Sequence, residues 1–153
     1  MNPLRRSLAS TAKFVATMTP ELQRIDHVHV FVSDRVAADA WYARVMGLRP
    51  IPELVFWSAD GGPLTLGNAS GSVHVALFEG AMQSCRSTLA LGVGAVEFLA
   101  WQSHLEAVLQ RRVAPIDHQV SWSLYFSDPD GNPFEITSNE YDLISSQVRP
   151  AET

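Results

Sequence analysis

The sequence predicts an α+β fold made of two tandem βαβββ units, and three observations support this fold class. Residues 25–32 alternate between apolar and other side chains, as a strand does, and an amphipathic helix follows directly. The second half of the chain repeats this order of elements. With 153 residues, of which 46% are hydrophobic, the chain has the length of about one domain with a substantial core. Neither unit alone is expected to bury its sheet, so we expect the two units to pack together.

The first unit is predicted from residue 25 to about residue 80. In its first strand every second residue is valine, whereas the positions between them carry His27, His29 and Phe31 on the opposite face. Asp34 is the expected N-cap of the helix that follows, and Gly47 is its expected left-handed C-cap. Glycine-containing turns then separate three more predicted strands, at residues 54–57, 64–66 and 73–78.

The second unit is predicted from about residue 94 to residue 139. Its first strand is expected at Ala95–Trp101, and its helix is expected to begin at Ser103, with Glu106 completing a capping box. Residues 85–93 then form a linker between the units, and three short strands complete the second one, at residues 115–120, 122–126 and 134–138. The chain is accordingly divided into an N-terminal extension at 1–24, one domain at 25–139 and a C-terminal tail at 140–153.

Composition narrows the classes of function. The formal net charge of -5 argues against nucleic acid or an anionic membrane as the main partner, because those partners favour basic patches. No apolar run approaches the roughly 20 residues that a membrane span requires. A single cysteine, Cys85, excludes an intramolecular disulfide and favours a reducing compartment. We therefore expect a cytoplasmic protein.

The most informative stretch is residues 116–135, which form a predicted hairpin with ionisable side chains around it. Its turn has the sequence Asp-Pro-Asp-Gly-Asn, and Glu135 follows on the returning strand, on the face opposite Phe134 and Ile136. A carboxylate in mid-strand is costly to bury without a metal ion or a hydrogen-bond partner. His118 and Tyr125, seven residues apart, suit facing positions on adjacent strands and are candidates for proton transfer.

The repeat and the hairpin together resemble the vicinal oxygen chelate superfamily, which includes glyoxalase I, bleomycin- and fosfomycin-resistance proteins and extradiol dioxygenases. The resemblance covers residues 25–139. It rests on the first strand with its Ser33-Asp34 end, on Trp41-Tyr42, on Met46-Gly47-Leu48 and on the hairpin from Tyr125 to Glu135. The spacing of His118, Tyr125, Asp128 and Glu135 also resembles the signature of ring-cleaving extradiol dioxygenases.

This resemblance implies a cupped sheet around a divalent metal ion, with ligands on the first strand of each unit and on the last strand. His27 and Glu135 match the first and last ligand positions. The predicted strand at Ala95–Trp101 puts Glu97 at the middle position, where the family usually has histidine. His74 is a further candidate ligand from the fourth strand. The metal is left open among Fe²⁺, Mn²⁺, Zn²⁺ and Ni²⁺. A carboxylate at the middle position shifts the preference from iron towards manganese or magnesium-like ions.

Structural roles are the alternatives for these side chains. His27 is alternatively a hydrogen-bonded histidine inside the cup, and His74 a surface or core histidine. Glu97 is alternatively a partner for arginine or a solvated residue at an edge. His118 alternatively caps a loop, and Tyr125 is alternatively a core aromatic residue. His29, which shares a face with His27, is expected to orient it or simply to pack.

Two functions follow from the resemblance. The first is a metal-dependent dioxygenase, or a lyase or isomerase, that chelates a small oxygen-bearing substrate, with His118 and Tyr125 as the acid–base groups. The second is a metal-free protein of the bleomycin-resistance type that sequesters a small molecule or an antibiotic, which the glutamate at position 97 favours. Tryptophans at positions 57, 101 and 122 are consistent with a pocket for an aromatic or planar ligand. The resemblance also implies a homodimer, which would cover exposed sheet edges.

Overall fold

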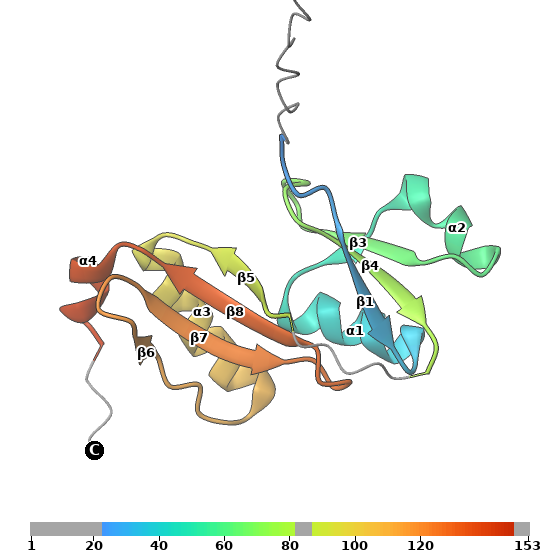
Figure 1. Ribbon diagram of the computed structural model, residues 1–153. Coiled ribbons are helices and arrows are strands. Elements are labelled where there is room, and N and C mark those ends of the chain that lie inside the picture. The colour runs from blue at the N-terminus through green and yellow to red at the C-terminus, as the bar shows by residue number, and fades with distance from the viewer. Residues whose placement is uncertain (1–22, 82–86, 149–153) are drawn as a thin grey trace, which may run out of the picture.

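The computed structural model describes residues 23–81 and 87–148, and these residues form two four-stranded sheets with helices packed against them (Figure 1). The first sheet has the order β1-β4-β3-β2, with β1 at Val28–Val32, β2 at Arg49–Pro50, β3 at Leu64–Gly67 and β4 at His74–Glu79. The second has the order β5-β8-β7-β6, with β5 at Leu89–Gly92, β6 at Ile116–Asp117, β7 at Trp122–Ser127 and β8 at Pro133–Ser138. The predicted α+β class and the two tandem units are therefore confirmed.

Both units share one topology, in which the first and last strands run parallel as neighbours. β1 pairs in parallel with β4, and β5 pairs in parallel with β8, whereas the remaining pairs are antiparallel. A parallel pair needs a long crossover connection, and the helix that follows each first strand is part of it. No helix in the described ranges has the length and apolar character needed to cross a membrane.

Helix α1, at Arg35–Val45, begins and ends where the local sequence predicts. The Asp34 carboxylate accepts hydrogen bonds from the backbone N–H groups of Val36 and Ala37, both at 2.9 Å. These bonds satisfy two donors that the first helical turn leaves free. Gly47 follows the helix with a φ of 67°, a left-handed conformation that glycine adopts without steric cost.

The predicted start of the second unit is wrong. Residues 95–101 form the first half of helix α3, at Ala95–Leu109, and β5 lies inside the stretch predicted as a linker. The backbone N–H of Ala95 donates to the carboxylate of Glu140, 45 positions later, so the cap of this helix comes from a distant part of the chain. Phe98 and Leu105 are both fully buried, at helical spacing. Cys85, at the other end of the predicted linker, lies outside the described residues.

The predicted capping box is wrong for the same reason. The Ser103 hydroxyl lies within α3 and donates to the Leu99 carbonyl one turn earlier. The Glu106 carboxylate accepts a hydrogen bond from the backbone N–H of Val113 at 3.1 Å, beyond the helix end.

The strand predicted at residues 54–57 is also wrong. These residues belong to a 3₁₀ turn, η1 at Pro52–Leu54, and to the short helix α2 at Phe56–Ala59. Proline at the start of η1 lacks the N–H group that a strand would donate to its neighbour. Phe56 and Trp57 remain 58% and 45% exposed. The other predicted strands are found as β3, β4, β7 and β8, and the one at 115–120 is found in part as β6.

A single hydrophobic core runs through both units. Helices α1 and α3 lie against the two sheets, and their buried residues belong to the same cluster as those of the strands. Its large, fully buried side chains are Tyr42, Leu66 and Leu77 in the first unit and Phe98, Leu105, Leu124, Phe134 and Ile136 in the second. The expectation that neither unit buries its sheet alone agrees with this shared core. A fourth helix, α4 at Tyr141–Ser145, lies in the predicted tail.

Candidate functional site

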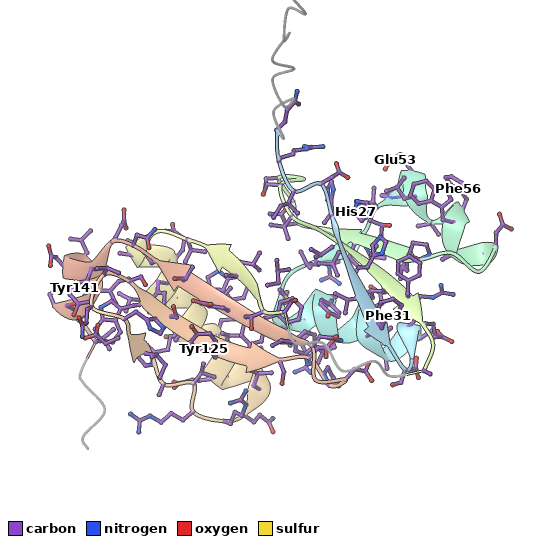
Figure 2. The ribbon with its side chains drawn as sticks, viewed as in Figure 1. His27, Phe31, Glu53, Phe56, Tyr125 and Tyr141 are labelled. Atoms are coloured by element: carbon purple, nitrogen blue, oxygen red, sulfur yellow. The ribbon has the colours of Figure 1, made fainter. Side chains whose placement is uncertain are left out.

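The first sheet presents histidines on the face that points away from its core. His29 of β1 pairs in register with Ala76 of β4, and strand alternation puts the preceding His27 on the same side. The His27 and His29 rings stack with centroids 5.1 Å apart, and the His29 ring packs against Phe78 at 4.7 Å. Figure 2 labels His27, just before β1, and Phe31 on β1, together with Phe56 on helix α2 of the same unit.

Hydrogen bonds link these histidines to an ion pair at the start of the strand. Arg24 donates to the Asp26 carboxylate at 2.8 Å, and Nδ1 of His27 lies 3.1 Å from the other oxygen of Asp26. The Nε2 atoms of His27 and His29 are 3.1 Å apart. The bond from His27, reinforced by Arg24, lowers the pKa of the Asp26 carboxyl below its ordinary value. Because a carboxylate only accepts, neutral His27 donates through Nδ1 and its Nε2 carries a lone pair.

His74 belongs to the same sheet but not to this pair. It is the first residue of β4, in register with Gly67 of β3. A Cβ atom added to Gly67 would meet the His74 ring at 3.2 Å, so the ring packs over the space that glycine leaves.

The second sheet presents oxygen atoms on its open face. Glu135 of β8 pairs in register with Tyr125 of β7 and with Ala90 of β5. The Ser123 hydroxyl donates to the Glu135 carboxylate at 2.6 Å and lies 3.2 Å from the Thr137 hydroxyl. Serine therefore fixes the orientation of a carboxylate that is half-buried.

The side chains of His118 and Tyr125 meet on this same face, although the two residues do not occupy the predicted facing positions on adjacent strands, because His118 follows the end of β6 and Ile116 pairs with Ser123. Nε2 of His118 lies 3.2 Å from the Tyr125 hydroxyl, and the two rings are nearly perpendicular at 89°. Tyr125 is 42% exposed and not a core residue. The pair thus stands beside Glu135 at a surface that a ligand can reach.

A third tyrosine, missed by sequence reasoning, supports the turn that carries His118. The Tyr141 hydroxyl donates to one oxygen of Asp117 at 2.9 Å, and the backbone N–H of Gln119 donates to the other at 2.6 Å. The bond to Asp117, together with burial, raises the pKa of the Tyr141 hydroxyl. Gln119 has a φ of 68°, unusual for a residue other than glycine. No local pattern links Tyr141 to this turn, since its partner lies 24 positions earlier.

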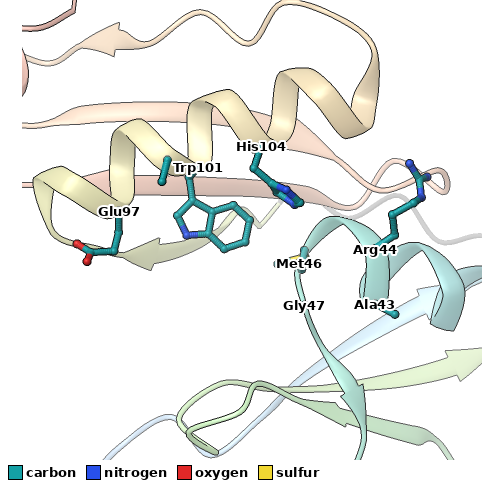
Figure 3. Close-up of a pocket in the computed structure, with 8 residues that line it drawn as sticks. Ala43, Arg44, Met46, Gly47, Glu97, Trp101 and His104 are labelled. Atoms are coloured by element: carbon teal, nitrogen blue, oxygen red, sulfur yellow. The ribbon is translucent and has the colours of Figure 1, made fainter.

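Glu97 lies in a different part of the molecule. It is exposed on α3, and it lines a pocket of about 460 Å³ between α1 and α3 with Trp101, His104, Arg44 and Met46 among others (Figure 3). Helix α3 covers the face of the second sheet that carries Phe134 and Ile136, whereas Glu135 faces the other way. The alignment that made Glu97 the middle ligand is therefore wrong, because it placed a helical residue on a strand.

The predicted convergence of His27, Glu97 and Glu135 within one chain does not occur. In residues 23–81 and 87–148, no three side chains of histidine, cysteine, aspartate or glutamate come together in a group that could hold a metal ion. On β5, the positions that share the open face with Glu135 are Ala90 and Gly92, which have no donor atom in their side chains. One chain thus has two separate sets of candidate ligands, the imidazole pair on β1 and the carboxylate on β8.

The whole domain matches a known family. The model of the Glyoxalase/Bleomycin resistance protein/Dioxygenase superfamily matches residues 24–136, so the chain belongs to this superfamily. No curated protein matches the sequence.

Solved structures share the fold at low sequence identity. A putative glyoxalase family protein from Bacillus anthracis is 21% identical, with a TM-score of 0.65, 80% of this chain covered and 100% of that one. The fosfomycin resistance protein FosX from Listeria monocytogenes, a variant complexed with Mn(II) and a dihydroxypropylphosphonic acid, is 16% identical, with a TM-score of 0.59 and coverage of 81% and 96%. The oxidase ChaP-H2 is 17% identical, with a TM-score of 0.60 and coverage of 79% and 97%.

Proposed function

We propose that this protein is a metal-dependent member of the superfamily that chelates a small oxygen-bearing substrate, with dioxygenase chemistry or lyase or isomerase chemistry. The observation that carries the proposal is the cluster on the second sheet, where the Glu135 carboxylate, oriented by Ser123, stands beside the hydrogen-bonded pair of His118 and Tyr125. This arrangement combines a possible metal ligand with a possible proton-transfer group. The binding of Mn(II) by FosX supports a metal in this fold.

The proposed ligands come from both sheets. His27 offers an unprotonated Nε2 on the first sheet, and Glu135 offers an oxygen on the second. When bound, a divalent ion would act as a Lewis acid for the negative charge that develops on the substrate oxygens. The candidate ions remain Fe²⁺, Mn²⁺, Zn²⁺ and Ni²⁺, all compatible with nitrogen and oxygen ligands.

The proposed site is completed in a homodimer. The pair of His27 and His29 does not meet Glu135 within the described part of one chain. In the proposed dimer, the histidine face of one copy would therefore lie opposite the Glu135 face of its partner. Helix α2 of the first unit leaves Phe56 58% exposed, and the Glu135 face of the second unit leaves Ile116 44% exposed. Burial of such side chains favours association. A mass in sedimentation equal to one 16.8 kDa chain would contradict this assembly.

His118 is the proposed proton-transfer group. In the tautomer of His118 whose Nε2 is unprotonated, the Tyr125 hydroxyl donates to Nε2, so its proton can pass to the imidazole while the hydroxyl oxygen takes a proton from a substrate. The ligand in this reading is aromatic or planar, because Tyr125 and Ile116 line the open face beside Glu135.

A metal-free binding protein is the second candidate function. The observation in its favour is that β5, the first strand of the second unit, presents only Ala90 and Gly92 on the open face. Such a protein would hold a planar ligand or an antibiotic between the exposed apolar side chains of the two faces.

Metal content separates the two functions. Protein purified without chelator is expected to contain a divalent metal, the Glu135→Ala variant is expected to lose it, and the Glu97→Ala variant is expected to keep it. Loss from Glu97→Ala, or none from Glu135→Ala, would contradict the proposed ligands. The His118→Gln variant should keep its metal while turnover falls by about 10²–10⁴-fold.

Substrates can be sought by thermal shift with catechols, thiol–aldehyde adducts and planar antibiotics, with and without added Mn²⁺. A compound that binds equally well to wild type, to Glu135→Ala and to chelator-treated protein would support the metal-free candidate instead.

A further inference from the structure

We infer that His29 is a metal ligand alongside His27, so that a single strand supplies both imidazoles of the site, with Asp26 and Arg24 as positioning residues. The inference rests on the proposed function, because it names the ligand that replaces Glu97. It assigns to His29 more than the orienting or packing role that its sequence position suggested.

The distance between the two Nε2 atoms carries the inference. They are 3.1 Å apart, on the face of the first sheet that points away from the core. Two imidazole nitrogens, each about 2.0–2.1 Å from one ion and at a tetrahedral or octahedral angle, lie about 3 Å apart. An ion can therefore bind both nitrogens once the proton that they share has moved from Nε2 to Nδ1 of His29, so that both imidazoles stay neutral and both Nε2 lone pairs face the ion.

The surroundings hold both rings in this arrangement. The Asp26 carboxylate, paired with Arg24 at 2.8 Å, accepts from Nδ1 of His27 and selects the tautomer whose Nε2 lone pair is free. The His29 ring packs against Phe78 with centroids 4.7 Å apart. The His27 side chain is 44% exposed, so an ion can reach the pair.

Other nitrogen ligands do not join this pair. His74 shares the open face and lines a pocket with His27, but its ring packs over Gly67. In the described part of the chain it does not gather with His27 and His29 into a group of three that could hold an ion. The open-face positions of β5 have no donor atoms in their side chains. His104 lies on α3, where its Nε2 is 2.8 Å from the Val45 carbonyl, on the helical side of the molecule. The proposed ligands are therefore His27 and His29 of one copy of the chain and Glu135 of a second copy.

The test uses Co²⁺ as the probe and the full-length protein. Affinity is measured by calorimetry, and the number of imidazoles per cobalt by X-ray absorption. Wild type is expected to show two imidazoles per cobalt. The His29→Gln variant should show one and bind more than about 100-fold more weakly, since loss of an orienting group alone costs about 10–100-fold. The Asp26→Asn variant should weaken binding by about 10–100-fold with two imidazoles retained.

The His74→Gln variant is the matched control, since it removes a histidine from the neighbouring strand of the same sheet. It is expected to bind Co²⁺ as wild type does. If wild type binds no Co²⁺, the proposed function and this inference fail together. If wild type binds Co²⁺ through one imidazole, or if His29→Gln binds as tightly as wild type, only the inference fails. If His29→Gln does not fold, a count of two that His74→Gln retains supports the inference, and a count that falls to one in His74→Gln overturns it.

Discussion

The two units repeat one order of elements but differ in how each is held together and in what each presents. In the first, α1 is capped by the adjacent Asp34, and the open face carries imidazoles. In the second, α3 is capped by Glu140 from 45 positions away, and the open face carries a carboxylate and hydroxyls. Backbone pairing and the shared core preserve the architecture, whereas open-face positions are free to change. The two units therefore present different side chains on their open faces rather than two copies of one set.

The last hairpins of the two units show the same contrast. In the turn between β3 and β4, the Asn68 side chain accepts from the backbone N–H groups of Ser72 and Val73, so this turn supports itself. In the turn between β7 and β8, the buried Asp128 accepts from its own turn and also from the Tyr42 hydroxyl of α1, at 2.8 Å. The second hairpin thus anchors one unit on the other.

The largest expected effect comes from breaking that anchor. Asp128→Ala removes the acceptor of the buried Tyr42 hydroxyl and of backbone donors in the turn, including the N–H of Asn132. Hydrogen bonds to a charged group contribute about 1.5–3 kcal/mol each, so the free energy of unfolding should fall by about 3–5 kcal/mol. Asn68→Ala, in the self-supporting turn, should cost about 1 kcal/mol. Urea denaturation of both variants measures the difference, and equal losses would refute the contrast between the hairpins.

The same anchor should make stability depend on alkaline pH. Burial and then the neighbouring Asp128 carboxylate raise the pKa of Tyr42 far above its ordinary value of about 10. The contribution of Tyr42 to the free energy of unfolding is complete below pH 10 and is lost as the pH rises above 10. The reason is that the unfolded chain then releases the hydroxyl proton, whereas the folded protein keeps it. The free energy of unfolding should fall by about 1.4 kcal/mol per pH unit from this group. Denaturation at pH 9–11 should show a shallower slope for Tyr42→Phe; an unchanged slope would exclude Tyr42 as the source.

Removing the two helix caps should give the smallest effects. Asp34→Ala and Glu140→Ala each take an acceptor from a helix N-terminus, so each should cost about 1 kcal/mol. Amide exchange should accelerate at Val36 and Ala37 in the first variant and at Ala95 in the second. Asp60→Ala, an exposed carboxylate after α2, is the control and should change stability by less than about 0.5 kcal/mol. Faster exchange at Ala95 in Asp34→Ala would show that the caps are not independent.

Local patterns in the sequence were sufficient for much of the fold and part of the site. Alternation along β1 predicted that His27 and His29 share a face, and Asp34 marked the start of α1. The hairpin from Tyr125 to Glu135 was recognisable because turn residues and strand alternation act over a few positions. The 3.1 Å approach of the two imidazole nitrogens was not predictable, since it depends on the side-chain torsions that Asp26 and Phe78 select.

By itself, then, the sequence determined the fold class, the first helix, the last hairpin and the faces of His27 and Glu135, each of which depends on neighbours along the chain. Only the tertiary structure decided that residues 95–101 are helical and that Glu97 lies away from Glu135. It also decided that Tyr141 supports the turn of His118 through Asp117. The physical reason is that these features depend on hydrogen bonds between residues 24 to 45 positions apart, which no local pattern of apolar and polar residues encodes.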